Sequence, residues 1–244
     1  MNSQTKFISI FFFVILWQAL SILINSSVFP TVIDILTNLS NHLINGELVD
    51  SLLITLKRVC IAFFISMAIG IFFGVLMGLS KKIDAMLDFI LIIGLNMPAL
   101  VTIIICYIWF GLTDFSALLA VIINKVPIII VNIREGTKAI EKKYTDLAKV
   151  YKLSKKDTVT KIYLPQIYPY IMASTRLSLS LIWKIILVVE LLGRSDGIGF
   201  QISMFFQLFD ITSILAYSFA FIFVILLIET FILKPIEDRM KRWK

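Results

Sequence analysis

Six stretches of this chain are almost entirely apolar, and each is long enough to cross a lipid bilayer as a helix. A spanning helix needs about 20 mainly apolar residues, because hydrocarbon offers the backbone no hydrogen-bonding partners and a helix satisfies its own amide groups. The stretches cover residues 7–24, 59–79, 89–110, 115–133, 171–192 and 211–233. The pattern therefore predicts an all-α membrane protein with six transmembrane helices.

Composition supports this class, since 59% of the 244 residues are hydrophobic and only 16% are charged. One soluble core of this size could not bury so much apolar surface. The first stretch is longer than the apolar core of a signal peptide and no Ala-x-Ala-like cleavage site follows it, so we expect a retained helix. Cys60 and Cys106 lie in or beside predicted spans, which favours packing roles over a disulfide or a metal site.

The distribution of Lys and Arg predicts the orientation in the membrane. With a cytoplasmic N-terminus, the inner segments hold one, two, nine and five Lys/Arg, whereas the outer segments hold two, none and one. Cytoplasmic loops carry the excess of positive charge, so we expect a multi-pass protein of the inner (cytoplasmic) cell membrane with both termini in the cytoplasm. The formal charge of +7 follows from this bias and from attraction to anionic lipid, so no nucleic-acid partner is expected.

The longest inner segment, residues 134–170, contains a pattern typical of a short amphipathic helix. Tyr144, Leu147, Ala148 and Tyr151 recur at i, i+3, i+4 and i+7, which places them on one helix face. Such an apolar stripe on a cytoplasmic loop has two interpretations. It packs back on the transmembrane bundle, or it inserts into a groove on a soluble partner.

A second helix is expected directly after this stripe. Ser154 followed by Asp157 fits a capping-box-like start, and Pro165 is expected to end that helix soon after Ile162 and Tyr163. The loop is therefore predicted to form a helix, a corner and a second helix.

These residues resemble the Glu-Ala-Ala loop of the permeases of binding-protein-dependent ABC importers. The matching positions are Asp146-Leu147-Ala148, then Lys152 after three residues, then Ile162-Tyr163-Leu164-Pro165 after nine more. Residues 29–233 are also similar to the sulfonate, taurine and nitrate branch of that family. This similarity lies in Phe29-Pro30-Thr31, Gly46-Glu47-Leu48, Ser51-Leu52, Lys57-Arg58, Pro98, Trp109-Phe110-Gly111-Leu112, Pro169, Arg176, Trp183 to Glu190, and Gly197-Ile198-Gly199.

The resemblance implies a type I importer permease fold with a cytoplasmic coupling helix. It implies a second permease subunit, either a copy of this chain in a homodimer, which we expect, or a different chain, together with two separate ATPase subunits that bind ATP and Mg, and an extracytoplasmic substrate-binding protein. It further implies that the corner docks on the ATPase. The docking residues would be Tyr144, Asp146, Leu147, Ala148, Tyr151, Lys152, Leu153 and Ser154.

Two positions of the corner depart from the family pattern. Asp146 replaces the family's Glu, and Lys152 replaces a Gly. A glycine at a helix end adopts a positive φ without Cβ strain, whereas a lysine there costs roughly 1 kcal/mol. A cation near the C-terminus of the first helix recovers a few tenths to about 1 kcal/mol through the helix dipole. We therefore expect the helix pair to be retained with a different corner.

The chain is expected to form a single permease domain over residues 1–244. Its parts are a peripheral first span (1–28), an extracytoplasmic linker (29–58), a five-helix core (59–233) that includes the coupling loop (134–170), and a basic cytoplasmic tail (234–244). No Gly-x-x-x-x-Gly-Lys-Ser/Thr phosphate loop occurs, so nucleotide must bind to another chain. We expect no enzyme activity, no catalytic residue, and no cofactor or metal on this chain; His42 stands outside any Cys/His cluster.

Several polar residues interrupt the apolar spans and are candidates to line a pathway. A lysine near the middle of a span costs about 2.5–3.5 kcal/mol if it faces lipid, so Lys125 and Lys184 should face protein or water. Two interpretations stay open: the lysines attract a small anionic solute, or they pair with Glu190 or a lipid carbonyl. The candidate pathway residues are Asn96, Asn124, Lys125, Lys184 and Glu190.

Glycine and proline mark two further features of the spans. Gly70, Gly74 and Gly78 form a repeated Gly-x-x-x-Gly that lets another helix approach closely, either as static packing or as a moving interface. Pro98 and Pro127 are expected to bend the third and fourth spans.

The predicted function is a permease for a small solute, with an organic or inorganic anion such as a sulfonate as the first candidate. A neutral vitamin precursor is the alternative substrate, and a secondary transporter is the rival mechanism. The outer segment 193–210 is expected to form a re-entrant or interfacial helix that closes the pathway and touches the binding protein, or else an ordinary aromatic anchor.

Overall fold

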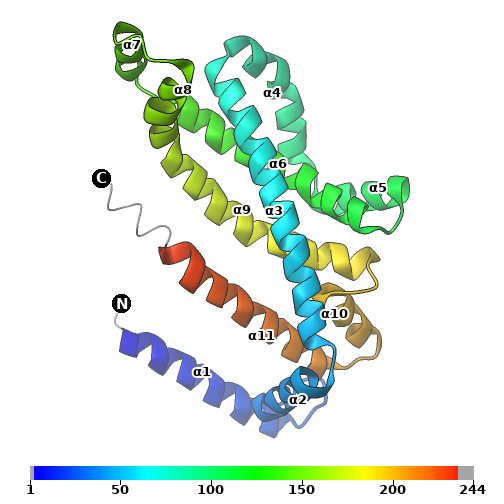
Figure 1. Ribbon diagram of the computed structural model, residues 1–244. Helices are drawn as coiled ribbons and strands as arrows, with labels where there is room; N and C mark the ends of the chain where they lie inside the picture. The colour runs from blue at the N-terminus through cyan, green and yellow to red at the C-terminus, as the bar shows by residue number, and fades with distance from the viewer. Residues whose placement is uncertain (1–2, 236–244) are drawn as a thin grey trace. The chain divides into compact units, whose positions relative to one another are not determined.

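The computed structural model describes residues 3–235, and all regular structure within that range is helical, which confirms the all-α prediction (Figure 1). Of the predicted basic tail, residues 236–244 lie outside the described part. The elements are α1 (Ser3–Ile24), α2 (Val32–Asn45), α3 (Leu48–Leu79), α4 (Lys81–Asn96), α5 (Ala99–Phe110), α6 (Asp114–Lys138), α7 (Lys142–Val150), α8 (Lys155–Thr158), the π-helical turn η1 (Val159–Tyr163), α9 (Leu164–Gly193), α10 (Ile198–Gln207), α11 (Ile211–Ile228) and the π-helical turn η2 (Glu229–Leu233).

Internal contacts divide the chain into two compact units, residues 1–55 with 190–244, and residues 56–189. In the first unit, α2 and α10 both pack on α11. Trp17 of α1 stacks on Phe29 with ring centroids 5.3 Å apart, and its Nε1 donates to the Pro30 carbonyl over 3.0 Å. Thr31 and Asp34 form a complete capping box that starts α2. The predicted linker is therefore helical, with an amphipathic helix between the first span and α3.

In the second unit, three glycines of α3 bring that helix into close contact with α6. The contacts are Gly70 with Ile129, Gly74 with Ile133, and Gly78 with Thr137, and a Cβ built on these glycines would meet those side chains at 2.4, 2.6 and 2.4 Å. The close approach predicted from the Gly-x-x-x-Gly repeat is thus present. Beyond these contacts, a core of buried residues gathers side chains from α3, α5, α6 and α9.

The third predicted span is broken rather than gently bent. Pro98 has no N–H to donate, and Met97 before it is extended at φ −74° and ψ 120°. The helices α4 and α5 on the two sides of this break meet at an angle of 99°. By contrast, Pro127 does not interrupt the fourth predicted span, because α6 continues through it from Asp114 to Lys138.

Pro165 does not end the second helix of the basic loop, contrary to expectation. Residues 155–193 are helical without a gap, and the π-helical turn η1 precedes the proline. The Leu164 N–H donates to the Val159 carbonyl five residues back, which is the wider π-helical spacing. Pro165 then falls in the first turn of α9, where its missing N–H is best tolerated.

Three helices of the described residues are long and apolar enough to cross a membrane, namely α3, α6 and α11 together with η2. The bent pair of α4 and α5 makes a fourth if it counts as one span. The other two predicted spans lie within α1 and α9. Apolar helices are thus shown, while the total of six spans stays a prediction.

Candidate functional site

The basic loop forms the predicted helix, corner and helix. After α7, Lys152 takes a left-handed conformation with φ 49°. The Leu153 N–H then turns back and donates to the Ala148 carbonyl over 2.9 Å. A hydrogen bond to the carbonyl five residues back, with a left-handed residue just before its donor, is the pattern of a Schellman helix end. Glycine is the usual left-handed residue in this motif. Lys152 therefore takes the left-handed conformation at the position where the resemblance expects glycine, so the expectation of a different corner was wrong.

The second helix starts at the predicted cap. The Asp157 N–H donates to the Ser154 Oγ over 3.0 Å, and that hydroxyl donates to the Asp157 carboxylate over 2.6 Å. Lys161, one turn later, forms an ion pair of 2.7 Å with the same carboxylate. The hydrogen bond from Lys161, followed by that from Ser154, lowers the pKa of Asp157. The corner thus has a hydrogen-bonded helix end on one side and a capped helix start on the other.

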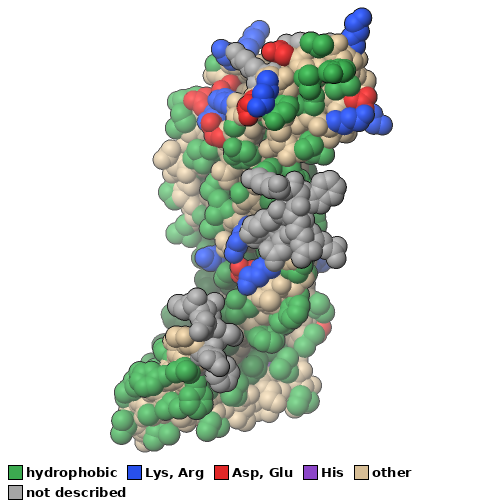
Figure 2. All heavy atoms as spheres, turned by 90° about the vertical axis from the view of Figure 1, so that its left-hand side faces the viewer, with side chains coloured by type: hydrophobic (Ala, Val, Ile, Leu, Met, Phe, Trp, Pro, Cys, Tyr) green, Lys and Arg blue, Asp and Glu red, His purple; other side chains and the backbone are tan. Residues whose placement is uncertain are grey.

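The apolar stripe of α7 has one buried and three accessible members. Ala148 is only 4% exposed, whereas Tyr144, Leu147 and Tyr151 are 39%, 50% and 70% exposed. The small residue thus lies inward, and the three large side chains are available for contact. The remaining predicted docking residues, Asp146, Lys152, Leu153 and Ser154, are exposed. In Figure 2, Lys and Arg side chains together with Asp and Glu gather at the end of the unit where α7 and α8 lie.

The two lysines of the predicted pathway lie in different surroundings within residues 56–189. Lys125 of α6 is 8% exposed, and no described side chain of its unit accepts a hydrogen bond from it or forms an ion pair with it. Lys184 of α9 is exposed, with its Nζ 5.4 Å from the ring centroid of Trp183. Neither lysine is neutralised by a carboxylate of that unit.

The other three candidate pathway residues make local hydrogen bonds. Asn96 is exposed, and its side chain donates to the Ile92 carbonyl over 2.8 Å, one turn back. The Asn124 side chain donates across the α4–α5 break to the Met97 carbonyl over 3.5 Å. Glu190 is fully buried and accepts hydrogen bonds from Thr55 and Gly199 within the first unit. The five candidates are therefore not gathered in one cluster by any described contact.

Sequence reasoning missed an ionic cluster between α4 and α6. The Arg134 guanidinium contacts Asp84 at 3.2 Å and Asp88 at 2.7 Å, and Lys138 contacts Asp84 at 2.7 Å. The available signal was the pair of acids spaced i, i+4 at the start of α4, matched by basic residues spaced i, i+4 at the end of α6. A second ion pair joins buried Arg58 to Asp114 over 2.7 Å at the start of α6.

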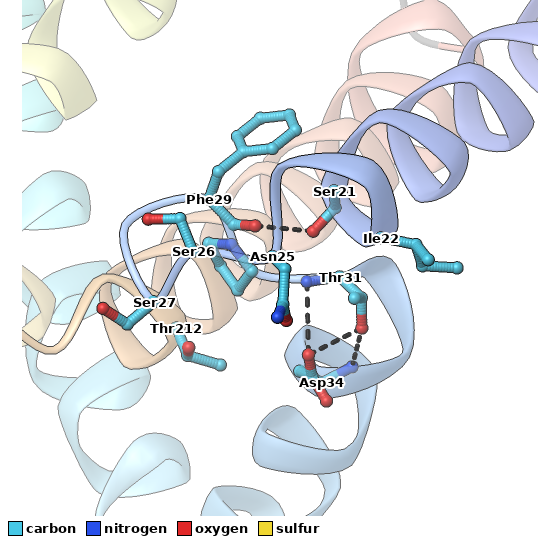
Figure 3. Close-up of a pocket in the computed structure, with 10 residues that line it drawn as sticks. Ser21, Ile22, Asn25, Ser26, Ser27, Phe29, Thr31, Asp34 and Thr212 are labelled. Carbon is cyan, nitrogen blue, oxygen red and sulfur yellow. Dashed lines mark hydrogen bonds between the residues drawn. The ribbon is translucent and has the colours of Figure 1, made fainter.

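A cavity of about 390 Å³ opens where α1 gives way to α2 (Figure 3). Its polar groups are largely engaged locally: Thr31 N–H and Oγ1 both donate to the Asp34 carboxylate, and Ser21 Oγ donates to the Phe29 carbonyl. Within the described residues, no group of three or more His, Cys, Asp or Glu side chains could hold a metal ion. Two of the lining residues, Thr31 and Asp34, thus serve to cap α2.

Comparison with known proteins identifies the family. A protein of Bacillus subtilis assigned as an aliphatic sulfonates transport permease is 26% identical over 231 residues, covering 94% of this chain and 83% of that protein. A nitrate import permease of Synechococcus elongatus is 30% identical over 200 residues, covering 78% and 72%. The taurine transport system permease of Escherichia coli is 24% identical over 189 residues, covering 78% and 68%. Because residues 66–234 also match the family model, this chain belongs to the binding-protein-dependent transport system inner membrane components, the permeases of ABC transporters.

Proposed function

We propose that this chain is the permease subunit of an ATP-driven importer that passes a small anion delivered by an extracytoplasmic binding protein. Two copies of the chain would form the pathway, and two separate ATPase subunits would bind ATP and Mg. Family membership supports the role of permease, and the relatives named for sulfonates, nitrate and taurine support the anion class. The chain itself would supply the pathway and the docking surface, with no chemical step.

The corner between α7 and α8 carries this proposal. A surface that docks on a soluble subunit needs apolar side chains that are accessible and held by a defined backbone. Tyr144, Leu147 and Tyr151 meet the first condition by their exposure, and the hydrogen-bonded helix end at Lys152 meets the second. Of the two earlier interpretations of the stripe, insertion into a partner's groove is therefore the one we propose.

Copurification tests the docking role directly. The tagged chain is coexpressed with its ATPase, purified in detergent, and the bound ATPase is quantified. Leu147→Asp and Tyr151→Asp should each lose the ATPase, because a carboxylate would be buried unpaired in the partner's groove. Val150→Asp is the matched control, since Val150 is 76% exposed on the same helix but lies about 110° away from the stripe. Retention of the ATPase by both stripe variants, or its equal loss in the control, would contradict the proposal.

The direction of the helices supports the proposed membrane topology. The helices α3 and α6 run parallel, because later residues of α3 contact later residues of α6: Gly70 meets Ile129, and Gly78 meets Thr137. Two parallel spans require that the segment between them, α4 and α5, returns the chain once across the membrane. This agrees with six spans, both termini in the cytoplasm, and the corner on the cytoplasmic face.

Lys125 and Lys184 are a second argument for an anionic substrate. A positive charge inside a span is costly unless it meets a counter-charge or water, and neither lysine has an anionic partner among the described residues of its unit. An anionic solute would supply that counter-charge while it crosses the membrane. In a homodimer the two lysines become four, which favours a small anion over a neutral solute.

Uptake by the reconstituted complex tests whether the two lysines bind the anion. Lys125→Gln and Lys184→Gln should raise the half-saturating concentration for nitrate or a sulfonate while the amount of folded complex stays constant. Lys184→Arg is the control that keeps the charge. Unchanged half-saturation together with a lower protein level would show that the lysines serve folding rather than the pathway.

A further inference from the structure

The N-terminus of α10 is held by a fully buried carboxylate. Glu190, in the last turn of α9, is 0% exposed, and its Oε2 accepts from the Gly199 N–H over 3.0 Å and from the Thr55 hydroxyl over 2.9 Å. The same Thr55 hydroxyl accepts from the Ile198 N–H over 2.9 Å. Thr55 is itself 0% exposed. The first two N–H groups of α10 are thus satisfied by side chains of α3 and α9.

The arrangement requires a carboxylate at this point and glycine beside it. The first N–H groups of a helix lack partners within it and attract negative charge, while a buried carboxylate needs donors. Gly197 has φ 95°, and a Cβ built on it would lie 2.5 Å from the Glu190 Cδ. Any side chain at Gly197 would therefore push the carboxylate off α10. The Glu190 carboxylate thus binds the N-terminus of α10 and is not exposed to solvent.

Further contacts fix the rest of α10 and leave its far end uncovered. Gln201 donates to the Glu47 carboxylate over 2.9 Å, and the Phe205 ring lies 5.1 Å from that of Tyr217. Beyond these contacts, large apolar side chains are exposed in the first unit: Phe206 at 66%, Leu208 at 68% and Phe209 at 83%. α10 is thus firmly attached on one face and presents an apolar end.

We propose that Glu190 is a positioning residue that makes α10 move together with the end of α9 during transport. Residues 155–193 are helical without a gap, so the helical segment that starts at the proposed cytoplasmic corner carries Glu190 in its last turn. The carboxylate then passes any displacement of that helix end to α10 directly through hydrogen bonds, in addition to the covalent connection of residues 194–197. The inference rests on the proposed transport function, and it assigns Glu190 a role different from lining the pathway.

The test uses the complete permease–ATPase complex in proteoliposomes with its binding protein. The variants are Glu190→Gln, which removes the charge at constant shape, and Thr55→Val, which removes the linking hydroxyl. Thr55→Ser keeps that hydroxyl. Thr37→Val is the matched control, because its hydroxyl bonds only to Ile33 of its own helix on an exposed face. A spin label at Phe206→Cys, with Cys60 and Cys106 changed to Ser, reports how α10 responds to ATP.

Glu190→Gln and Thr55→Val should assemble with the ATPase and hydrolyse ATP, while uptake falls about tenfold or more, because the first removes the charge that strengthens both bonds and the second removes the linking hydroxyl. The ATP-dependent change of the label at position 206 should disappear in both variants. Thr55→Ser and Thr37→Val should match the parent in uptake and label response.

Parent-like uptake or an unchanged label response in Glu190→Gln would overturn the inference. Failure of both Glu190→Gln and Thr55→Val to assemble would also overturn it, because the cluster would then serve folding alone. Absence of ATP-driven uptake in the parent complex would instead refute the proposed function, so the two failures are distinguishable.

Discussion

Replacing Lys152 by glycine is expected to strengthen the corner between α7 and α8. Lys152 holds a φ of 49°, where the Cβ of an L-residue crowds its own backbone. Glycine has no Cβ and adopts this conformation freely. The Leu153 N–H bond to the Ala148 carbonyl depends on this left-handed residue, so the substitution acts on the bond that ends α7.

The size of the effect follows from two opposing contributions. A left-handed backbone costs a residue with a Cβ about 1–2 kcal/mol of stability, and glycine avoids this cost. Glycine is also more flexible in the unfolded chain, which lowers the stability of the folded state by about 0.5–1 kcal/mol. Lys152→Gly also removes a charge near a helix C-terminus, which is worth about 0.3–1 kcal/mol. Lys152→Ala removes the same charge and keeps the Cβ. The comparison of Gly with Ala thus isolates the strain, at about 0.5–1 kcal/mol in favour of Gly.

Amide hydrogen exchange of the full-length protein in nanodiscs measures this difference locally. The Leu153 amide should exchange about two- to fivefold more slowly in Lys152→Gly than in Lys152→Ala, because local opening becomes rarer. Asp146, in the middle of α7, supplies the matched control: there, glycine should be less stable than alanine by about 0.5–1 kcal/mol. If glycine weakens protection at both sites, the left-handed strain does not exist and the reasoning about the corner is refuted.

Three further predictions test the packing and the charges. Gly74→Ala should destabilise the protein by about 1–3 kcal/mol in thermal unfolding, because its Cβ would meet the Ile133 Cβ at 2.6 Å; an unchanged unfolding temperature would contradict the close contact. Arg134→Ala should lower stability by about 1 kcal/mol, and Asp88→Ala should cost less in that variant than in the parent; an equal cost in both would mean that the Arg134–Asp88 pair contributes nothing. The Asp157 carboxyl should titrate below its ordinary value in ¹³C NMR, so its stabilisation is complete above the unfolded-state pKa and is lost as pH falls through the folded-state pKa; titration at the ordinary value would contradict this.

Local chemistry made the corner predictable from sequence. The i, i+3, i+4, i+7 spacing that starts at Tyr144 and the Ser154–Asp157 cap depend on residues only a few positions apart, so their geometry is set by the helix itself. The left-handed Lys152 was not predicted, because the substitution of lysine for glycine led us to expect a different corner. Exposure of the stripe, by contrast, had to be read from the structure.

Proline showed the limit of local reasoning. Pro98, Pro127 and Pro165 carry the same missing N–H, yet the first breaks a span, the second lies inside α6, and the third follows a π-helical turn. What differs is the packing around each proline, which the sequence does not specify. Pro127, for example, lies against Gly94 of α4: a Cβ built on Gly94 would meet the Pro127 Cγ at 2.7 Å. The role of Glu190 was hidden for a similar reason, because Thr55 lies 135 positions away along the chain.

The contact between α3 and α6 also bears on whether the glycine repeat is a static or a moving interface. Gly70, Gly74 and Gly78 meet partners that are likewise four residues apart on α6, so each glycine receives one side chain. Gradual sliding would drive those side chains into the ridges between the glycines, where no space exists at contacts this close. The same glycine–side chain contacts can re-form only after a shift of four residues, which is about 6 Å along the helix axis. We therefore expect α3 and α6 to move as one body during transport, with the change of access occurring elsewhere in the permease.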